Sequence, residues 1–528
     1  MAERRLSRRT FVGAAATVLA APGIIGCASA PRRWQRDPFA LGVAAGSPSS
    51  DGFVLWTRLA PEPLNYDPLA PAGMTGDAVT IDYEVASDPA MRTIVSRGTT
   101  IADPRFAYSV HLEITGLRPG RPYWYRFISG EAMSRTGRAM TAPAPGIPLE
   151  RLTFGFVSCS NYEHGFFSAY RHLADEQPDF VLYLGDYIYE YPDMRLNEIV
   201  RRHSEGVETA SLSAYRNRYA QYRLDPDLQR LHAEATALMT WDDHEVQNDY
   251  ADQWSQTFED PQRFLMRRAA AYQVYYEHMP VRTLSRPNGP TMRIYDRFTF
   301  GDLLEISLID GRQYRSRGAC YGPPDKGRAH LESNAGCPER LDATRSMLGA
   351  EQESWLFDGF ARSSARWNLL AGDVMISQWR QTNAIGETAF STDDWNGYPA
   401  ARTRLLNGIR ESRLANPVAV CGDLHSYWAN DLKLDFDDPS SLTVATEFVG
   451  TSVSARPAPY EAFTPYLRDN PHVRYFESRQ RGYVSVVLTR QNMTTRFRVV
   501  SDVADPNAAV STLRSFVVEG GRPGAIEG

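Results

Sequence analysis

After residue 150 the chain alternates between short apolar runs and stretches of helical periodicity. Helices are predicted at 166–176, 214–221, 262–278 and 351–363, where apolar residues recur at helical spacing. Each apolar run has the character of a buried strand and ends in a cluster of polar residues. The runs are LTFGFVSCSN, DFVLYLGDYIYE, ATALMTWDDHE, LLEISLIDGRQ, WNLLAGDVM and PVAVCGDLHS. Strands whose carboxyl ends carry chemical groups are typical of layered α/β enzymes, which bind ligands at those ends.

The residues before this region follow a different pattern. Residues 37–143 show no helical periodicity and alternate polar with apolar positions, as in VTIDYEVASDP and TIVSRGTTIA. The segment Leu117–Tyr123 resembles the turn and corner tyrosine of a fibronectin type III or immunoglobulin-like sandwich. The sequence therefore predicts an α+β protein of two domains, an N-terminal antiparallel β-sandwich over 37–143 and a layered α/β domain over 150–528, joined by a linker at 142–148.

The first segment, residues 1–30, is predicted to be an export signal. A basic start is followed by an apolar run over 11–25 that is too short to span a bilayer, and Ser7–Val12 (SRRTFV) matches the twin-arginine pattern. This pattern predicts recognition by the twin-arginine translocase and a destination in the periplasm or cell envelope. Release after Ala30 is one outcome. Attachment to the membrane through a lipid on Cys27, which ends a lipoprotein-like box, is the other.

The formal net charge of −6 includes this basic leader, so the exported part of the chain is more acidic still. Such a chain has no general electrostatic attraction for nucleic acid or anionic lipid, and no specific nucleic-acid binding is expected. An anionic substrate would need a locally positive site, which metal ions provide compactly.

Four cysteines follow the leader. Cys320 and Cys337 bracket a loop rich in glycine and proline, and in an exported protein this arrangement favours a disulfide, although the sequence alone leaves the bond open. Cys421 lies in an apolar run and is expected to be a small buried residue. Cys159 has no obvious disulfide partner and stands at a strand end, so we expect it to bind metal as a thiolate.

Acidic and metal-binding residue types recur at the ends of the predicted strands. They are Cys159, Asp186, Asp243 with His244, Asp373, and Asp423 with His425. A single Asp or His after a strand is commonly only part of a turn. Several carboxylates that converge on one crevice, however, repel one another unless cations lie between them. Their recurrence therefore predicts a metal site.

The donor types divide these residues into two sets. Thiolate from Cys159, phenolate from Tyr189 and imidazole from His425 suit a transition metal, and phenolate favours ferric iron. Tyr189 follows Asp186 by three residues, so a short loop directs both toward one ion. The second set offers only oxygen and favours calcium. It comprises Asp243 and Asp423, with Asp186 as a bridge between the two sites.

Four motifs, in this order along the chain, resemble those of the alkaline phosphatase D family of metallophosphoesterases. They are Cys159, the Gly-Asp-x-x-Tyr element at 185–189, WDDHE at 241–245 and GDLH at 422–425. The Gly-Asp-x-x-Tyr element is also similar to that of purple acid phosphatases. The run LGVAAGSPSSDGFVLWTRLAP resembles the opening of the family's N-terminal domain, so the likeness covers nearly the whole chain.

The resemblance implies a β-sandwich followed by a metallophosphoesterase domain that hydrolyses phosphate esters. By position it assigns Fe3+ to the first donor set together with Asp186, and one or two Ca2+ to the second set. The middle histidine ligand of the wider superfamily has no clear counterpart, and Asp373 is a candidate for its place. Arg312 and Arg315 fit either phosphate clamps or surface ion pairs.

In the expected mechanism a metal-bound hydroxide attacks phosphorus in line with the leaving alcohol. His244, oriented by Glu245, protonates the leaving oxygen, and Asn161 donates to a phosphate oxygen. The ligands do not separate monoesters from diesters, so a phosphodiesterase or phospholipase D activity on small-molecule or lipid esters is an alternative. An envelope binding protein with a vestigial site is a further alternative, and such a protein would lack ligands.

Overall fold

The computed structural model describes residues 32–193, 196–322 and 330–528. The predicted export signal, with Ser7–Val12, Cys27 and Ala30, lies outside these residues. Within the described ranges, no helix is long and apolar enough to cross a membrane.

Ten strands form the larger of the two sheets that dominate the fold. Their order is β25-β24-β23-β22-β9-β10-β11-β1-β2-β5. The central strands β9 (Arg151–Val157), β10 (Phe180–Leu184) and β11 (Thr236–Thr240) run parallel. The others are β1 (Val43–Ser49), β2 (Gly52–Arg58), β5 (Ser109–Ile114), β22 (Gly482–Thr489), β23 (Asn492–Val500), β24 (Val510–Glu519) and β25 (Arg522–Glu527). Segments from both ends of the chain thus extend one sheet.

A second, seven-stranded sheet contains the remaining predicted strands of the α/β region. Its order is β12-β13-β15-β18-β20-β19-β21, in which β13, β15, β18 and β20 are parallel. The bounds are β12 (Asp296–Phe300), β13 (Leu304–Leu308), β15 (Trp367–Ala371), β18 (Pro417–Cys421), β19 (Tyr427–Lys433), β20 (Thr443–Val449) and β21 (Val473–Glu477). A separate small sheet consists of β14 (Leu331–Ser333), β17 (Thr388–Ser391) and β16 (Gln381–Thr382). All six apolar runs predicted as buried strands are strands.

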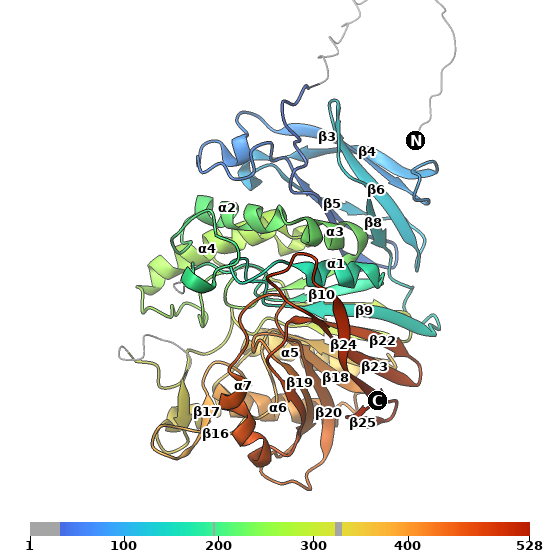
Figure 1. The fold of residues 1–528 in the computed structure, drawn as a ribbon. Coiled ribbons are helices and arrows are strands. Elements are labelled where there is room, and N and C mark those ends of the chain that lie inside the picture. Colours follow the sequence, from blue (N-terminus) through green and yellow to red (C-terminus); the bar gives the residue numbers. More distant parts are fainter. Residues whose placement is uncertain (1–31, 194–195, 323–329) are drawn as a thin grey trace, which may run out of the picture.

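The two large sheets pack face to face through an apolar core. Phe154 of β9 and Phe180 of β10 stack with ring centroids 4.9 Å apart, and Phe180 stacks on Phe300 of the second sheet at 4.6 Å. Helices cover the outer sides of both sheets, so the central strands are apolar on both faces. Figure 1 shows α1 to α4 between the N-terminal strands, at the top of the view, and strands β9 and β10.

Four helices lie where the helical periodicity predicts them. They are α1 (Ser168–Asp175), α2 (Leu212–Arg223), α4 (Pro261–His278) and α5 (Gly349–Arg362). Three further helices lie outside the predicted ranges: α3 (Pro226–Glu234), α6 (Pro399–Glu411) and the single turn α7 (Tyr460–Phe463). Both α3 and α6 begin with proline, and Asp225 caps α3 by accepting from backbone N–H groups. These start signals are present in the sequence, but the spacing of apolar residues does not show them.

The N-terminal part forms the predicted antiparallel sandwich, with one addition. Its first sheet has the order β4-β3-β6-β7, with β8 beside β6. The bounds are β3 (Val79–Ala86), β4 (Ile94–Ala102), β6 (Pro122–Ser129), β7 (Ala132–Met133) and β8 (Gly137–Met140). The Arg118 N–H donates to the Tyr123 hydroxyl at 2.9 Å, which confirms the corner tyrosine. The other sheet of the sandwich consists of β1, β2 and β5. It is also one edge of the ten-stranded sheet, because β1 pairs with β11 at Ala45 and Thr236.

The four cysteines of the described residues form one disulfide and two free, buried thiols. Cys320 and Cys337 form a disulfide, which answers the question that their spacing left open. Cys421, the last residue of β18, is a free and buried cysteine. Cys159 is also free and buried, and it lies two residues beyond the end of β9. Cys159 is therefore available as a ligand.

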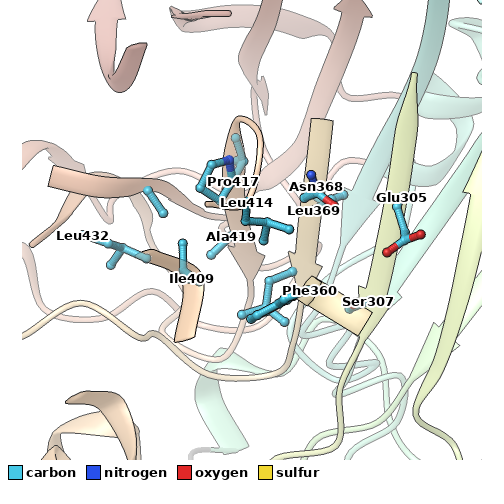
Figure 2. Close-up of a pocket in the computed structure, with 13 residues that line it drawn as sticks. Glu305, Ser307, Phe360, Asn368, Leu369, Ile409, Leu414, Pro417, Ala419 and Leu432 are labelled. Atoms are coloured by element: carbon cyan, nitrogen blue, oxygen red, sulfur yellow. The ribbon is translucent and has the colours of Figure 1, made fainter. Parts of the chain in front are cut away.

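An apolar cavity of about 10 Å³ lies between the second sheet and helices α5 and α6. Figure 2 shows its lining, which includes Phe360, Leu369 and Ile409. Asn368 and Pro417 also line it, and both lie at the amino ends of their strands. The cavity has room for about one water molecule, and ligands in folds of this kind bind at the carboxyl ends. We therefore assign this cavity to side-chain packing.

Candidate metal centre

Four predicted ligands come together at the carboxyl ends of three strands. One ligand atom each from Cys159, Asp186 and His425 lies within 4.8 Å of the other two. The Tyr189 hydroxyl donates to Asp186 Oδ2 at 2.9 Å and lies 2.9 Å from His425 Nε2. These residues follow β9, β10 and β18, so both large sheets contribute to the group. The donor set that the sequence predicts for iron is therefore assembled in one place.

The backbone at the predicted ligands adopts an uncommon conformation. Cys159, Asp186, Asp423 and His425 have φ of 59°, 52°, 65° and 51°, in the left-handed region that residues other than glycine rarely occupy. Such conformations cost roughly 1–3 kcal/mol each and persist where the surrounding structure enforces them. Their concentration at the ends of three strands indicates a functional site.

Two glycines allow the strand ends to approach one another. Gly185 has φ of 96°, and a Cβ there would lie 2.4 Å from the Cβ of Asp242. A Cβ on Gly422 would lie 2.3 Å from Ser158 Oγ. Close packing between strand ends therefore requires glycine at both positions, and at Gly185 the positive φ requires it as well.

Two further ligand groups adjoin the first, and each shares a carboxylate with the group before it. We call these three groups together the row of carboxylates. A second group, with ligand atoms within 4.8 Å of one another, consists of Asp186, Asp243 and His244. A third consists of Asp243, Asp249 and Asp393. Asp186 and Asp243 each have one buried oxygen, Oδ1, without a hydrogen-bond partner among the described residues. Unpaired buried carboxylate oxygens at the two shared positions fit bridging cations.

The His425 ring is oriented for coordination through one nitrogen. Its Nδ1 donates to the Arg456 carbonyl at 2.7 Å, which leaves Nε2 directed at Tyr189. Burial lowers the pKa of His425 to about 4, although the hydrogen bond to Arg456 opposes this shift. The ring is therefore neutral at physiological pH and offers the Nε2 lone pair, as a metal-binding histidine must.

Burial and neighbouring carboxylates make Asp186 and Cys159 reluctant to ionise without a cation. Burial raises the pKa of Asp186 well above its usual range, and Asp243 adds to the increase while His244 opposes it. Burial also raises the pKa of the Cys159 thiol, with a contribution from Asp186. Coordination to a cation is what deprotonates such groups. The donor set therefore fits metal ions, and a neutral thiol in this setting is a poor nucleophile by itself.

Arg312 is a buried counter-charge to the row and not a surface residue. Its Nη1 donates to both carboxylate oxygens of Asp393, at 2.9 and 2.8 Å, and its Nε pairs with Asp242. Its Nη2 lies 3.7 Å from Asp243 Oδ2 and 3.8 Å from Asp423 Oδ1. Asp423 thus faces Arg312 and belongs to none of the three ligand groups, and its role as a calcium ligand stays a prediction.

Two other candidates that the sequence left open are buried in the same region. Arg315 donates to Asp393 Oδ1 at 2.6 Å and to the Asp393 carbonyl at 2.7 Å, so it holds a member of the third ligand group. Asp373 accepts from the backbone N–H groups of Gly311 and Val374, both at 3.1 Å. These contacts give Asp373 a role in fixing the strand ends.

His244 is oriented by a glutamate that the sequence pattern does not single out. Its Nδ1 donates to Glu190 Oε2 at 2.7 Å, and Glu190 Oε1 accepts from the Asn248 N–H at 2.7 Å. Burial alone would lower the pKa of His244, but Asp186, Asp243 and Glu190 together raise it well above its usual range. Ionised carboxylates beside the ring therefore favour the protonated form of His244.

The role expected for Glu245 is wrong. Its carboxylate accepts from the backbone N–H groups of Asp186, Tyr187 and Asp242, at 3.2, 2.6 and 2.9 Å. Glu245 therefore fixes the turn after β10 to the turn after β11. Glu190, and not Glu245, orients His244.

Asn161 is buried two residues beyond Cys159. Its Oδ1 accepts from the Glu163 N–H at 2.9 Å, and its backbone carbonyl accepts from the Ser454 hydroxyl at 2.7 Å. The side-chain oxygen of Asn161 is thus occupied by the Glu163 N–H, whereas its side-chain amide N–H groups suit a bond to a phosphate oxygen. This catalytic role stays a prediction.

A cavity of about 220 Å³ adjoins the third ligand group. Asp249 lines it together with Trp254, Phe258, Arg317 and Tyr321. The Arg317 guanidinium lies over the rings of Trp254 and Phe258, 5.0 and 5.7 Å from their centroids. The cavity beside Asp249 is therefore lined by aromatic rings and by the positive charge of Arg317.

Three residues of the centre are absent from the sequence prediction. Glu190 follows Tyr189 directly, but it stands in the aromatic run DYIYEY, where no pattern marks it. Asp249 lies within the motif TWDDHEVQNDYA, so its proximity to Asp243 is a signal that was available. Asp393 follows the short strand β17 and has no such signal.

Two facing sheets with outer helices, and metal-binding residue types at the carboxyl ends of their parallel strands, fit a metal-dependent enzyme of the layered α/β class. Residues 154–497 match the PhoD-like phosphatase family, and residues 26–143 match the N-terminal domain of PhoD-like phosphatases. The chain belongs to the PhoD-like phosphatase family and is a phosphoester hydrolase. The family resemblance seen in the motifs is confirmed.

Two relatives support this assignment over most of the chain. Alkaline phosphatase D of Bacillus subtilis (strain 168) is 43% identical over 489 residues, which cover 91% of this chain and 81% of that protein. A solved structure of PhoD aligns with a TM-score of 0.88 and 42% identity, covering 94% of this chain and 93% of the other.

Proposed function

We propose that the protein is an exported, metal-dependent phosphatase that hydrolyses small-molecule or lipid phosphate esters with iron and calcium bound. The observation that carries this proposal is the row of three ligand groups joined by Asp186 and Asp243. A binding protein with a vestigial site would have lost donors from such a row. Each of the three groups contains side chains that can bind a cation.

The donor types decide which metal each group would hold. Iron is proposed for the group of Cys159, Asp186, Tyr189 and His425, because thiolate, phenolate and imidazole suit a transition metal. One or two calcium ions are proposed for the carboxylate groups, because hard cations prefer oxygen. When bound, these ions would supply positive charge for the phosphate and activate water for attack on phosphorus.

The chain's own groups act on the leaving alcohol and the phosphate. His244, held by Glu190, donates its proton to the leaving oxygen as the P–O bond breaks. Asn161 donates an amide N–H to a phosphate oxygen. The cavity lined by Asp249 and Trp254 has room for the organic part of the ester.

Metal removal tests the proposal. Hydrolysis of p-nitrophenyl phosphate and of bis(p-nitrophenyl) phosphate is expected to stop when a chelator has removed the metals. Activity should return only when iron and calcium are restored together, because the two kinds of group prefer different cations. The measurement is turnover alongside metal content, with zinc alone as a control. Full turnover by protein that retains no metal would contradict the proposal.

We also propose that the protein leaves the cytoplasm by the twin-arginine route. The support is Ser7–Val12, in which Arg8 and Arg9 form the arginine pair. Changing both to lysine is expected to leave folded, precursor-length protein in the cytoplasm, because the translocase recognises the pair itself. Cell fractionation with immunoblotting measures the distribution.

The matched control changes Arg4 and Arg5 to lysine, which alters the same number of arginines outside the motif. This control should be exported normally. Normal export of the Arg8 and Arg9 variant would show that the leader belongs to another pathway. Mass spectrometry of the exported protein then separates release after Ala30 from a lipid on Cys27.

A further inference from the structure

The loop after β20, residues 452–456, contacts the turn that presents Cys159; we call it the brace loop. The Val453 N–H donates to the Ser158 carbonyl at 3.0 Å, and the Ala455 N–H donates to the Cys159 carbonyl at 3.2 Å. The Ser454 hydroxyl donates to the Asn161 carbonyl at 2.7 Å. The brace loop is therefore fixed to the segment that follows β9.

The last residue of the brace loop, Arg456, links two histidines through its backbone. Its carbonyl accepts from His425 Nδ1 at 2.7 Å, and this bond leaves Nε2 of His425 for the metal. Its N–H donates to His164 Nδ1 at 3.1 Å. The Arg456 carbonyl fixes the tautomer of His425, and the ring of His164 holds the backbone of Arg456 in place.

Asp193 completes the connection. His164 Nε2 donates to Asp193 Oδ2 at 2.5 Å, and the Arg456 guanidinium pairs with the same carboxylate. Arg456 Nε also lies 3.0 Å from Glu198 Oε2. The side chains of His164 and Asp193 are only 9% and 7% exposed, so water competes little for these bonds. Arg456 is therefore held at its backbone by His164 and at its side chain by Asp193.

We propose that His164 is a positioning residue for the metal centre, which rests on the proposed metal-dependent function. Through the backbone of Arg456, and with Asp193 as its own anchor, it keeps the His425 ring in the tautomer and orientation that present Nε2. Partners that orient a metal-binding histidine typically change metal affinity by about 10- to 100-fold when they are removed. His164 can affect metal affinity through Arg456 alone, without touching a metal ligand itself.

Two substitutions separate this role from simple packing. His164→Leu removes the acceptor for the Arg456 N–H, whereas His164→Asn keeps an oxygen near the position of Nδ1. The matched control is His172→Leu on α1, because His172 also bonds a backbone group, the Ala508 carbonyl at 2.8 Å, away from the centre. Iron retained after dialysis against graded chelator concentrations is the main readout, with the thermal midpoint of the metal-free protein as the second.

His164→Leu is expected to lose iron at about 10- to 100-fold lower chelator concentration than the unmodified protein, with a similar metal-free midpoint. His164→Asn and His172→Leu should retain iron like the unmodified protein. Unchanged retention in folded His164→Leu would overturn the inference, and so would equal losses in His164→Leu and His172→Leu. If His164→Leu does not fold, His164→Gln, whose oxygen reaches past Nδ1, must show the loss. An unmodified protein that binds no transition metal would instead refute the proposed function.

Discussion

Asp186→Asn is expected to lower kcat/KM by at least about a thousandfold and to reduce iron and calcium content together. Asp186 belongs to two of the three ligand groups, so one carboxylate would serve both of the proposed kinds of site. Asparagine keeps the size of the side chain but removes its charge and one oxygen donor, and it is a weaker partner for either cation. Turnover and metal analysis of the same preparation measure both effects.

The matched control is Asp179→Asn, which lies at the amino end of the same strand. Asp179 Oδ2 accepts from the Thr153 N–H at 2.7 Å and is remote from the row of carboxylates. This variant should keep its metals and its turnover. Full metal occupancy with near-normal turnover in Asp186→Asn would show that Asp186 does not bridge the sites.

His244→Gln is expected to slow the hydrolysis of alkyl phosphates by about 10²–10⁴-fold and to affect p-nitrophenyl esters much less. An alkoxide needs a proton as it leaves, whereas nitrophenolate is stable without one. The bond from His244 to Glu190 would hold the ring for this transfer. The measurement is kcat/KM across a series of leaving groups, and the variant should show a steeper dependence on leaving-group pKa.

The same series decides between two roles for His244, which also lies within ligand distance of Asp186 and Asp243. Loss of a metal ligand would slow all substrates alike and reduce metal content. Glu190→Gln provides the companion variant, because it weakens the orientation of His244 without touching the ring. It should reproduce the steeper leaving-group dependence in milder form. Equal losses for all esters would assign His244 to metal binding.

The strands and layers of the fold could be predicted because they depend on local pattern. Short runs such as DFVLYLGD are apolar on both faces, which is typical of a strand buried between layers. The pairing of β1 with β11 could not be predicted, since Ala45 and Thr236 are far apart in the sequence. That pairing joins the sandwich to the larger sheet. Helices α3 and α6 were hidden for a different reason, because their start signals are caps and prolines instead of apolar spacing.

The metal-binding residue types were predictable because chemistry and position agree. Cys159, Asp186 and His425 each follow a strand, and parallel strands bring their carboxyl ends to one edge. The partners that orient these ligands were not predictable. The Glu190 carboxylate accepts from the ring of His244 and the Arg456 carbonyl accepts from the ring of His425, and neither acceptor leaves a pattern in the sequence.

Iron content and visible absorption of the natively exported protein test the account most directly. A ferric ion bound to the Tyr189 phenolate and the Cys159 thiolate should give about one iron per chain and a charge-transfer band in the visible range. Tyr189→Phe should bleach or shift this band, whereas Tyr191→Phe, which changes a tyrosine two residues further along, should leave it in place. The protein is expected to be coloured, and its colour is expected to depend on Tyr189. A colourless, fully active protein that contains zinc or calcium and no iron would contradict it.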